Sequence, residues 1–166
     1  TRIEAVRLDG GASGTCGTCV DQDMNLLSVS GTGTEIVNVE GRAAFSHGAR
    51  VGFSSGPVTI RDSWFHHNYG SGVKADGVVL ERNTIELTGR RLSDNAVATS
   101  NGVGVRREAL SEMVTNANLI RNQTSHGIDA LLTSEGLSFN DDAVCGNGGA
   151  GILVEGQGAV GGTQAV

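Results

Sequence analysis

A short apolar pattern recurs along most of the chain and constrains the fold more than any other feature of the sequence. Each copy consists of an apolar residue, any residue and a second apolar residue, and four of the six copies directly follow a glycine. The copies lie at residues 27–29, 51–53, 73–75, 103–105, 128–130 and 152–154. Their starts are 24, 22, 30, 25 and 24 residues apart, so the chain repeats a unit of nearly constant length.

Two further patterns stay in step with the first. Apolar segments at 58–60, 78–80 and 137–139 are each followed, five residues after their last member, by Phe65, Ile85 or Val144. Val114 and Leu119 keep the same offset. An asparagine then recurs three residues further on and predicts a turn, because asparagine tolerates left-handed backbone angles. These asparagines are Asn68, Asn122 and Asn147.

Three short strands in each repeat account for this spacing. The segments alternate with a period of two and are too short for ordinary helices. Stacked coils pair equivalent strands in parallel and collect the inward residues in one apolar column. We expect that column to contain Val51, Val73, Val103, Ile128 and Ile152. A glycine-rich β-sandwich is the alternative, but it has no reason to keep three patterns in phase, so the sequence favours an all-β solenoid of about six coils.

Composition excludes several other classes of protein. The chain has 26 glycines but 1 proline, whereas a collagen combines regular glycine with abundant proline. Its hydrophobic share of 38% is too high for a disordered chain. The net charge of -6 argues against a nucleic-acid partner, and no apolar stretch is long enough for a membrane span. The first residues include neither an initiator methionine nor a signal peptide, so we expect a soluble chain trimmed from a longer parent.

The repeats resemble a known family. Residues 78–85, 119–122 with 127–128, and 144–147 with 151–154 are similar to the repeats of right-handed parallel β-helices of the pectin-lyase-like superfamily. The resemblance covers residues 27–154 and implies one right-handed parallel β-helix domain over 1–166. Members of this superfamily are mostly secreted or periplasmic and include polysaccharide lyases, glycosidases, epimerases, phage tailspikes and adhesins. The fold therefore does not select the chemistry.

The cysteines bear on the cellular compartment. Cys16 and Cys19 form a single C-x-x-C pair, which predicts a local disulfide in a secreted protein rather than a zinc site. Cys145 lies about five coils away, beyond the reach of a disulfide, and is expected to be free or intermolecular. Together with the resemblance, these features indicate a secreted, periplasmic or cell-surface location.

Two insertions interrupt the repeat. Residues 87–102 are expected to form a long loop, and residues 106–112 lengthen the next corner. Ala109, Leu110, Met113 and Val114 fit one face of a short helical turn there. Both insertions flank the strand at 103–105, so they would wall a groove on the outward face of the first sheet. The expected groove floor is Gly52, Lys74, Gly104 and Asp129.

Arginines on these walls suggest a ligand for the groove. Arg90, Arg91, Arg106 and Arg107 lie in the insertions of a chain that is acidic overall. Guanidinium groups bind carboxylates and sulfates bidentately, so we expect an acidic polysaccharide or cell-surface glycan as the partner. The alternative is that these arginines pair with Asp94, Glu108 and Glu112 or merely keep the loops soluble.

The resemblance to pectate-type lyases implies a basic side chain as the catalytic base and aspartates that bind calcium. Lys74 and Asp129 are the matching residues, with Asp76 as a spare ligand and calcium as a candidate cofactor. Gly104 is expected between them, which separates them by about 10 Å at two strand spacings. That distance is too long for one shared set of metal ligands, so we expect binding rather than catalysis.

The histidines form a second candidate site. Aligning Phe45 with Phe65 places His47 over His67 in adjacent coils, with His66 beside them. Imidazoles one strand spacing apart would bind a metal together, with Glu86 as a third ligand, or titrate as a pair. The alternative is a group of solvent-exposed histidines at a corner.

Two functions from different classes follow. The first is an extracellular β-helix module that binds an acidic polysaccharide in the groove. A stronger form of this hypothesis is that the module also processes the polysaccharide. The second is a structural or adhesive solenoid, such as a stalk, a tailspike-like protein or a filament subunit, that self-associates through open ends whose strand edges are unpaired.

Overall fold

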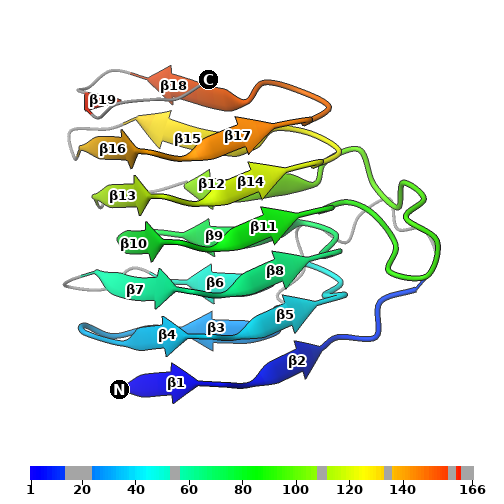
Figure 1. Cartoon of the computed structure of the whole chain (residues 1–166), viewed down its shortest axis with the longest axis horizontal. Coiled ribbons are helices and arrows are strands. Elements are labelled where there is room, and N and C mark those ends of the chain that lie inside the picture. Colours follow the sequence, from blue (N-terminus) through cyan, green and yellow to red (C-terminus); the bar gives the residue numbers. More distant parts are fainter. Residues whose placement is uncertain (14–23, 53–56, 108–111, 133–135, 157–159, 162–166) are drawn as a thin grey trace.

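The computed structural model winds the chain into a stack of three-stranded coils (Figure 1). It describes residues 1–13, 24–52, 57–107, 112–132, 136–156 and 160–161. Equivalent strands of successive coils pair in parallel and form one seven-stranded and two six-stranded sheets. The expected all-β parallel β-helix of about six coils is confirmed.

The three sheets follow one another in every coil. Sheet A contains β1 (Arg2–Glu4), β4 (Glu35–Val37), β7 (Val58–Arg61), β10 (Val78–Glu81), β13 (Met113–Asn116), β16 (Leu137–Asn140) and β19 (Val160–Gly161). Sheet B contains β2 (Arg7–Asp9), β5 (Glu40–Arg42), β8 (Trp64–His66), β11 (Thr84–Glu86), β14 (Leu119–Arg121) and β17 (Ala143–Cys145). Sheet C contains β3 (Leu27–Val29), β6 (Ala49–Val51), β9 (Ser71–Ala75), β12 (Val103–Arg107), β15 (Ile128–Leu132) and β18 (Ile152–Gly156).

Sheets A and B largely follow the predicted pattern. Val58, Val78 and Leu137 face inward in one register, and Phe65, Ile85 and Val144 occupy one column of sheet B. One coil differs from the prediction by a single residue. The inward positions there are Thr115 and Ile120, both fully buried, whereas the predicted Val114 and Leu119 are partly exposed on the outer face. The prediction missed this register because it counted only apolar residues, and the inward residue Thr115 is polar.

Sheet C corrects the predicted core column. Val73 pairs in register with Val105 rather than with Val103. Val103, the first residue of β12, pairs with Ser71 instead. Val51 is in register with Ala75 and belongs to a second inward column. The first column is Ala49, Val73, Val105, Ile128 and Ile152.

Glycines fix the corner where sheet B turns into sheet C. A Cβ atom added at Gly104 would lie 2.5 Å from the carbonyl oxygen of Gly127 and 2.7 Å from Ile120 Cγ2. The same close approach recurs in three other coils, at Gly48, Gly72 and Gly127. Successive coils can therefore stack closely at this corner only where the side chain is absent.

A second corner joins sheet A to sheet B through one residue with a left-handed backbone. The residues at this position are Ala5, Asn38, Asp62, Arg82, Ala117 and Asp141, with φ between 52° and 54°. The corner from sheet B to sheet C begins in the same way at Ala43, His67, Leu87 and Asn122. The predicted turn is correct for Asn122. Asn68 and Asn147 lie one residue later, where their carboxamide oxygens accept backbone N–H groups of Ala44 and Gln123.

The expected helical turn near residue 110 is wrong for the part that the structure describes. Met113 and Val114 belong to strand β13, and Arg107 is the last residue of β12. Ala109 and Leu110 lie outside the described residues. Among the described residues, no helix is long and apolar enough to cross a membrane.

Candidate functional site

Four charged side chains form a column on the outer face of sheet C. Arg50 is in register with Lys74, Lys74 with Arg106, and Arg106 with Asp129. Parallel strands lie about 4.8 Å apart, so the column presents one charged group per coil along the axis of the solenoid. We call Arg50, Lys74 and Arg106 the cationic ladder.

The cationic ladder ends on an ion pair. Arg106 Nη2 lies 3.3 Å from Asp129 Oδ2, and each side chain keeps 25% of its surface exposed. The column thus holds three cations against one carboxylate, although the whole chain has a net charge of -6. A surface with this local excess of positive charge attracts an anionic partner.

A shallow groove of about 220 Å³ adjoins the first member of the ladder. It is lined by Ser28, Val29, Ser30, Arg50 and Gly52. The hydroxyl groups and the guanidinium in its walls donate hydrogen bonds, which suits carboxylate or hydroxyl oxygens of a ligand.

The structure corrects the expected floor of this face. Arg106, not Gly104, lies between Lys74 and Asp129, and Arg50, not Gly52, is the residue in register with Lys74. The separation of Lys74 from Asp129 by two strand spacings remains.

Calcium does not fit this face. Asp129 is already paired with Arg106, and its strand neighbours in the column are cationic or apolar. In the described part of the chain, no group of three or more His, Cys, Asp or Glu side chains is arranged to hold a metal ion. The residues of this face therefore do not support the calcium cofactor that the resemblance implies.

The insertion at 87–102 projects from the corner between sheets B and C (Figure 1). Its own arginines stabilise it. Arg90 Nη1 donates to the Asn95 carbonyl at 3.0 Å, and Arg91 forms two hydrogen bonds to Asp94 at 2.7 and 3.1 Å. These contacts hold Arg90 and Arg91 within the loop, as the alternative interpretation of the arginines expects for Arg91.

A small apolar cluster fixes the same insertion to the solenoid. Ala98 and Leu92 of the insertion pack with Tyr69, Ala43 and Phe45 of the underlying corners. Burial raises the pKa of the Tyr69 hydroxyl above its ordinary value. The insertion is therefore packed against the corners of the solenoid, and the groove beside Arg50 is lined by none of its residues.

Arg107 does not face the groove. Its side chain is 1% exposed and donates to the carbonyl oxygen of Leu131. It occupies the inward column of sheet C, in register with Ala130. The expectation that Arg107 contacts a ligand is wrong because strand alternation turns it toward the interior.

The histidines are arranged differently from the prediction. His66 Nδ1 lies 2.7 Å from His67 Nδ1, and both rings are buried. His47 does not lie over His67, because Phe65 is in register with Gly41 rather than with Phe45. The Nδ1 of His47 accepts the backbone N–H of Ser71. His66 Nε2 approaches Glu40 at 3.3 Å, whereas Glu86 contacts Trp64 and Arg121. The two imidazoles are hydrogen-bonded to each other, which leaves no shared metal position between them.

Burial is the main influence on His66. Desolvation lowers the pKa of its imidazole below the ordinary value, the hydrogen bond to Glu40 opposes that shift, and the charge of His67 adds to it. The ring is therefore neutral over a wider pH range than an exposed histidine.

The structure describes only one of the three cysteines. Cys16 and Cys19 lie outside the described residues. Cys145 ends β17 and is free and exposed, as its distance along the coils predicts.

Sequence reasoning missed two residues that matter here, Arg50 and Trp64. Arg50 follows the corner Gly48 by two positions, as Lys74 follows Gly72 and Arg106 follows Gly104. Counting from the corner glycine would have found the ladder. Trp64 gives no periodic signal, since Thr84 and Leu119 occupy its place in neighbouring coils.

Comparisons with known proteins agree on the fold. The family described as "Right handed beta helix region" matches residues 3–164. The crystal structure of pectate lyase Pel9A superimposes with a TM-score of 0.63 and 16% identity, covering 76% of this chain. The chain spans 32% of that enzyme's length. Comparison with curated proteins finds no match. The matches confirm the expected right-handed parallel β-helix.

Proposed function

The chain belongs to the right-handed β-helix family, and on this premise we propose that the cationic ladder binds an acidic polysaccharide outside the cell. The observation that carries the proposal is the register of Arg50, Lys74 and Arg106 in adjacent coils. A polymer lying along the solenoid axis meets one cation about every 4.8 Å, so its carboxylates are engaged repeatedly.

Two further observations support an acidic sugar polymer. The ladder lies on a rigid sheet, which preorganises its charged groups and lowers the entropy cost of binding. A solved structure of similar fold is a pectate lyase by name, and pectate is an acidic polysaccharide. Since the chain spans about a third of that enzyme, the proposal covers binding, and Lys74 acts in it as an anchor.

Calorimetric titration with hexagalacturonate tests the proposal. We expect Arg50→Gln, Lys74→Gln and Arg106→Gln each to weaken binding about tenfold, since each removes a charge-assisted hydrogen bond. Arg82→Gln is the matched control, because Arg82 is an exposed arginine that pairs with Asp62 away from this face. Its affinity for hexagalacturonate should equal that of the wild type.

The same samples give the results that would contradict or extend the proposal. Absence of binding to hexagalacturonate and to a sulfated glycan, or an equal loss in Arg82→Gln, contradicts the proposal. Unsaturated products that absorb in the ultraviolet would extend it from binding to a lyase activity, and Lys74→Gln should then abolish them.

A further inference from the structure

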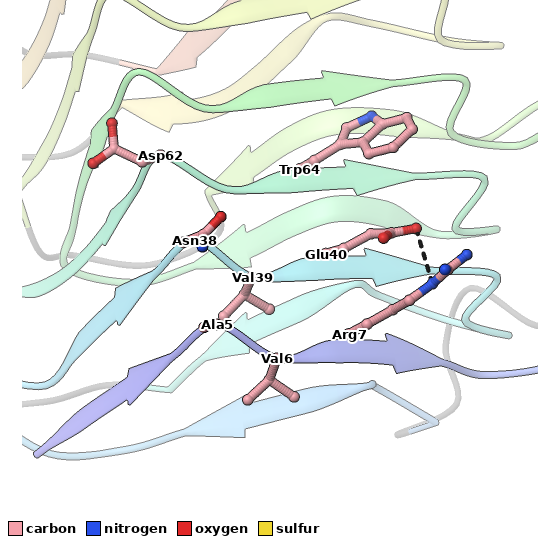
Figure 2. A pocket seen from close by; sticks show the side chains of 8 residues that line it. All are labelled: Ala5, Val6, Arg7, Asn38, Val39, Glu40, Asp62 and Trp64. Atoms are coloured by element: carbon pink, nitrogen blue, oxygen red, sulfur yellow. Dashed lines mark ion pairs between the residues drawn. The ribbon is translucent and has the colours of Figure 1, made fainter.

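A groove of about 350 Å³ lies on the outer face of sheet B and on the corner that joins it to sheet A, whereas the cationic ladder lies on sheet C (Figure 2). Its lining residues are Ala5, Val6, Arg7, Asn38, Val39, Glu40, Asp62 and Trp64. They come from three successive coils, and the indole of Trp64 lies on the strand next to that of Glu40. The groove therefore combines apolar surface with a polar rim, the usual make-up of a small-molecule site.

Trp64 is exposed yet held in place. It keeps 42% of its surface accessible, while its Nε1 donates to Glu86 Oε1 at 3.0 Å. Its ring stacks on His66 with centroids 3.9 Å apart and planes 19° apart. Glu86 is itself fixed by Arg121 at 2.8 Å. A flat aromatic surface immobilised in this way offers contact area at little entropy cost.

The charged groups of the groove are already balanced. Glu40 lies 3.3 Å from both Arg7 and His66 and 3.8 Å from Arg42. Asp62 pairs with Arg82 at 2.8 Å and with Arg61 at 3.0 Å. A charged ligand of either sign would meet a like charge as well as an opposite one. An uncharged ligand with hydroxyl groups gains hydrogen bonds to these carboxylates without breaking the pairs.

We infer that this groove binds an uncharged sugar unit, with the apolar face of a pyranose against Trp64 and its hydroxyls toward Glu40 and Asn38. A pyranose has one apolar face and a ring of hydroxyls, which matches the indole, the exposed Val6 and the polar rim. The inference goes beyond the acidic-glycan proposal: it concerns another sheet and a ligand of different charge, and it stands or falls separately.

Fluorescence offers a direct test, because Trp64 is the single tryptophan among the 166 residues of the chain. The probes are xylohexaose, mannohexaose and maltohexaose at up to about 10 mM, a range suited to weak binding. We expect at least one of them to change the emission saturably and to protect the indole from acrylamide quenching. Trigalacturonate should do neither at this site.

Variants complete the test by calorimetry with the responsive probe. Trp64→Ala should abolish binding, Trp64→Phe should retain part of it, and Val6→Glu should block the floor while leaving the indole in place. Val97→Ala is the control, since Val97 is an exposed apolar residue of the insertion. No response from the wild-type indole to any neutral probe, or an equal response to trigalacturonate, overturns the inference even where a variant fails to fold.

Discussion

At the residue scale, Gly104 shows how one missing side chain sets the geometry of a corner. A Cβ at this position would lie 2.5 Å from the Gly127 carbonyl oxygen, closer than real contacts allow. We expect Gly104→Ala to lower the free energy of unfolding by about 1–3 kcal/mol, the usual cost of overpacking. Gly136→Ala, where a Cβ has open space, should change it by less than about 0.5 kcal/mol. Urea denaturation measures both, and equal stabilities would contradict the steric account.

His66 provides a second residue-scale prediction. Desolvation lowers the pKa of its imidazole in the folded chain, with Glu40 opposing and His67 and Arg42 adding to the shift. As the pH falls below about 6.5, the unfolded chain takes up the proton first, so the free energy of unfolding decreases toward the folded pKa. His66→Phe, which keeps an aromatic ring against Trp64, should flatten this decrease in urea titrations. The same slope in His66→Phe would refute the prediction.

The corner glycines also explain where sequence reasoning succeeded and where it failed. The apolar pattern predicted the solenoid because period-two alternation survives in every coil. It misplaced the residues of sheet C because Gly102 precedes an apolar residue as Gly104 does, and only the stacking contacts distinguish them. The ladder residue Arg50 was missed because the repeat was placed at residues 51–53, whereas β6 spans Ala49–Val51. Lys74 was expected on the groove floor and Arg106 on its wall.

At the element scale, a buried polar column joins the coils at the turn from sheet A to sheet B. Asn118 accepts hydrogen bonds from the backbone N–H and the Nδ2 of Asn83, and donates to Leu80 and Asp142. Asn118→Ala would leave these groups unpaired in the interior, so we expect a loss of about 2–4 kcal/mol. Asn101→Ala, an exposed residue of the insertion, should cost less than about 0.5 kcal/mol. Urea denaturation and faster exchange of the Asn83 amide check the prediction; an unchanged amide would contradict it.

The same elements mark the limit of sequence reasoning about the candidate site. The sequence predicted the insertion at 87–102, because this segment is longer than the equivalent segments of the other repeats. The pair of Arg91 with Asp94 was one of the alternatives that the sequence left open. The packing of Ala98 with Tyr69 was not predicted, because it forms only once the loop folds back on the solenoid. A loop length can thus be counted in the sequence, while the direction of its charged groups depends on packing.

At the scale of the whole molecule, charge is distributed unevenly over an acidic chain. The net charge is -6, yet sheet C carries Arg50, Lys74 and Arg106 in one column, whereas the groove on sheet B holds charges of both signs. A uniform acidic surface would repel uronates. The stacked register places three cations beside one carboxylate on one face, and the proposed function requires this local charge to offset the repulsion.

The salt dependence of binding should therefore differ between the two faces. Raising the ionic strength from about 0.05 to 0.5 M shortens the Debye length several-fold, so the affinity of hexagalacturonate for the cationic ladder should fall by about an order of magnitude. Binding of a neutral hexasaccharide at Trp64 rests on stacking and hydroxyl hydrogen bonds and should change less than about twofold. Calorimetry and tryptophan fluorescence measure the two in the same buffers. A matching salt dependence would mean that both ligands occupy one charged surface, and the assignment of separate faces would then be wrong.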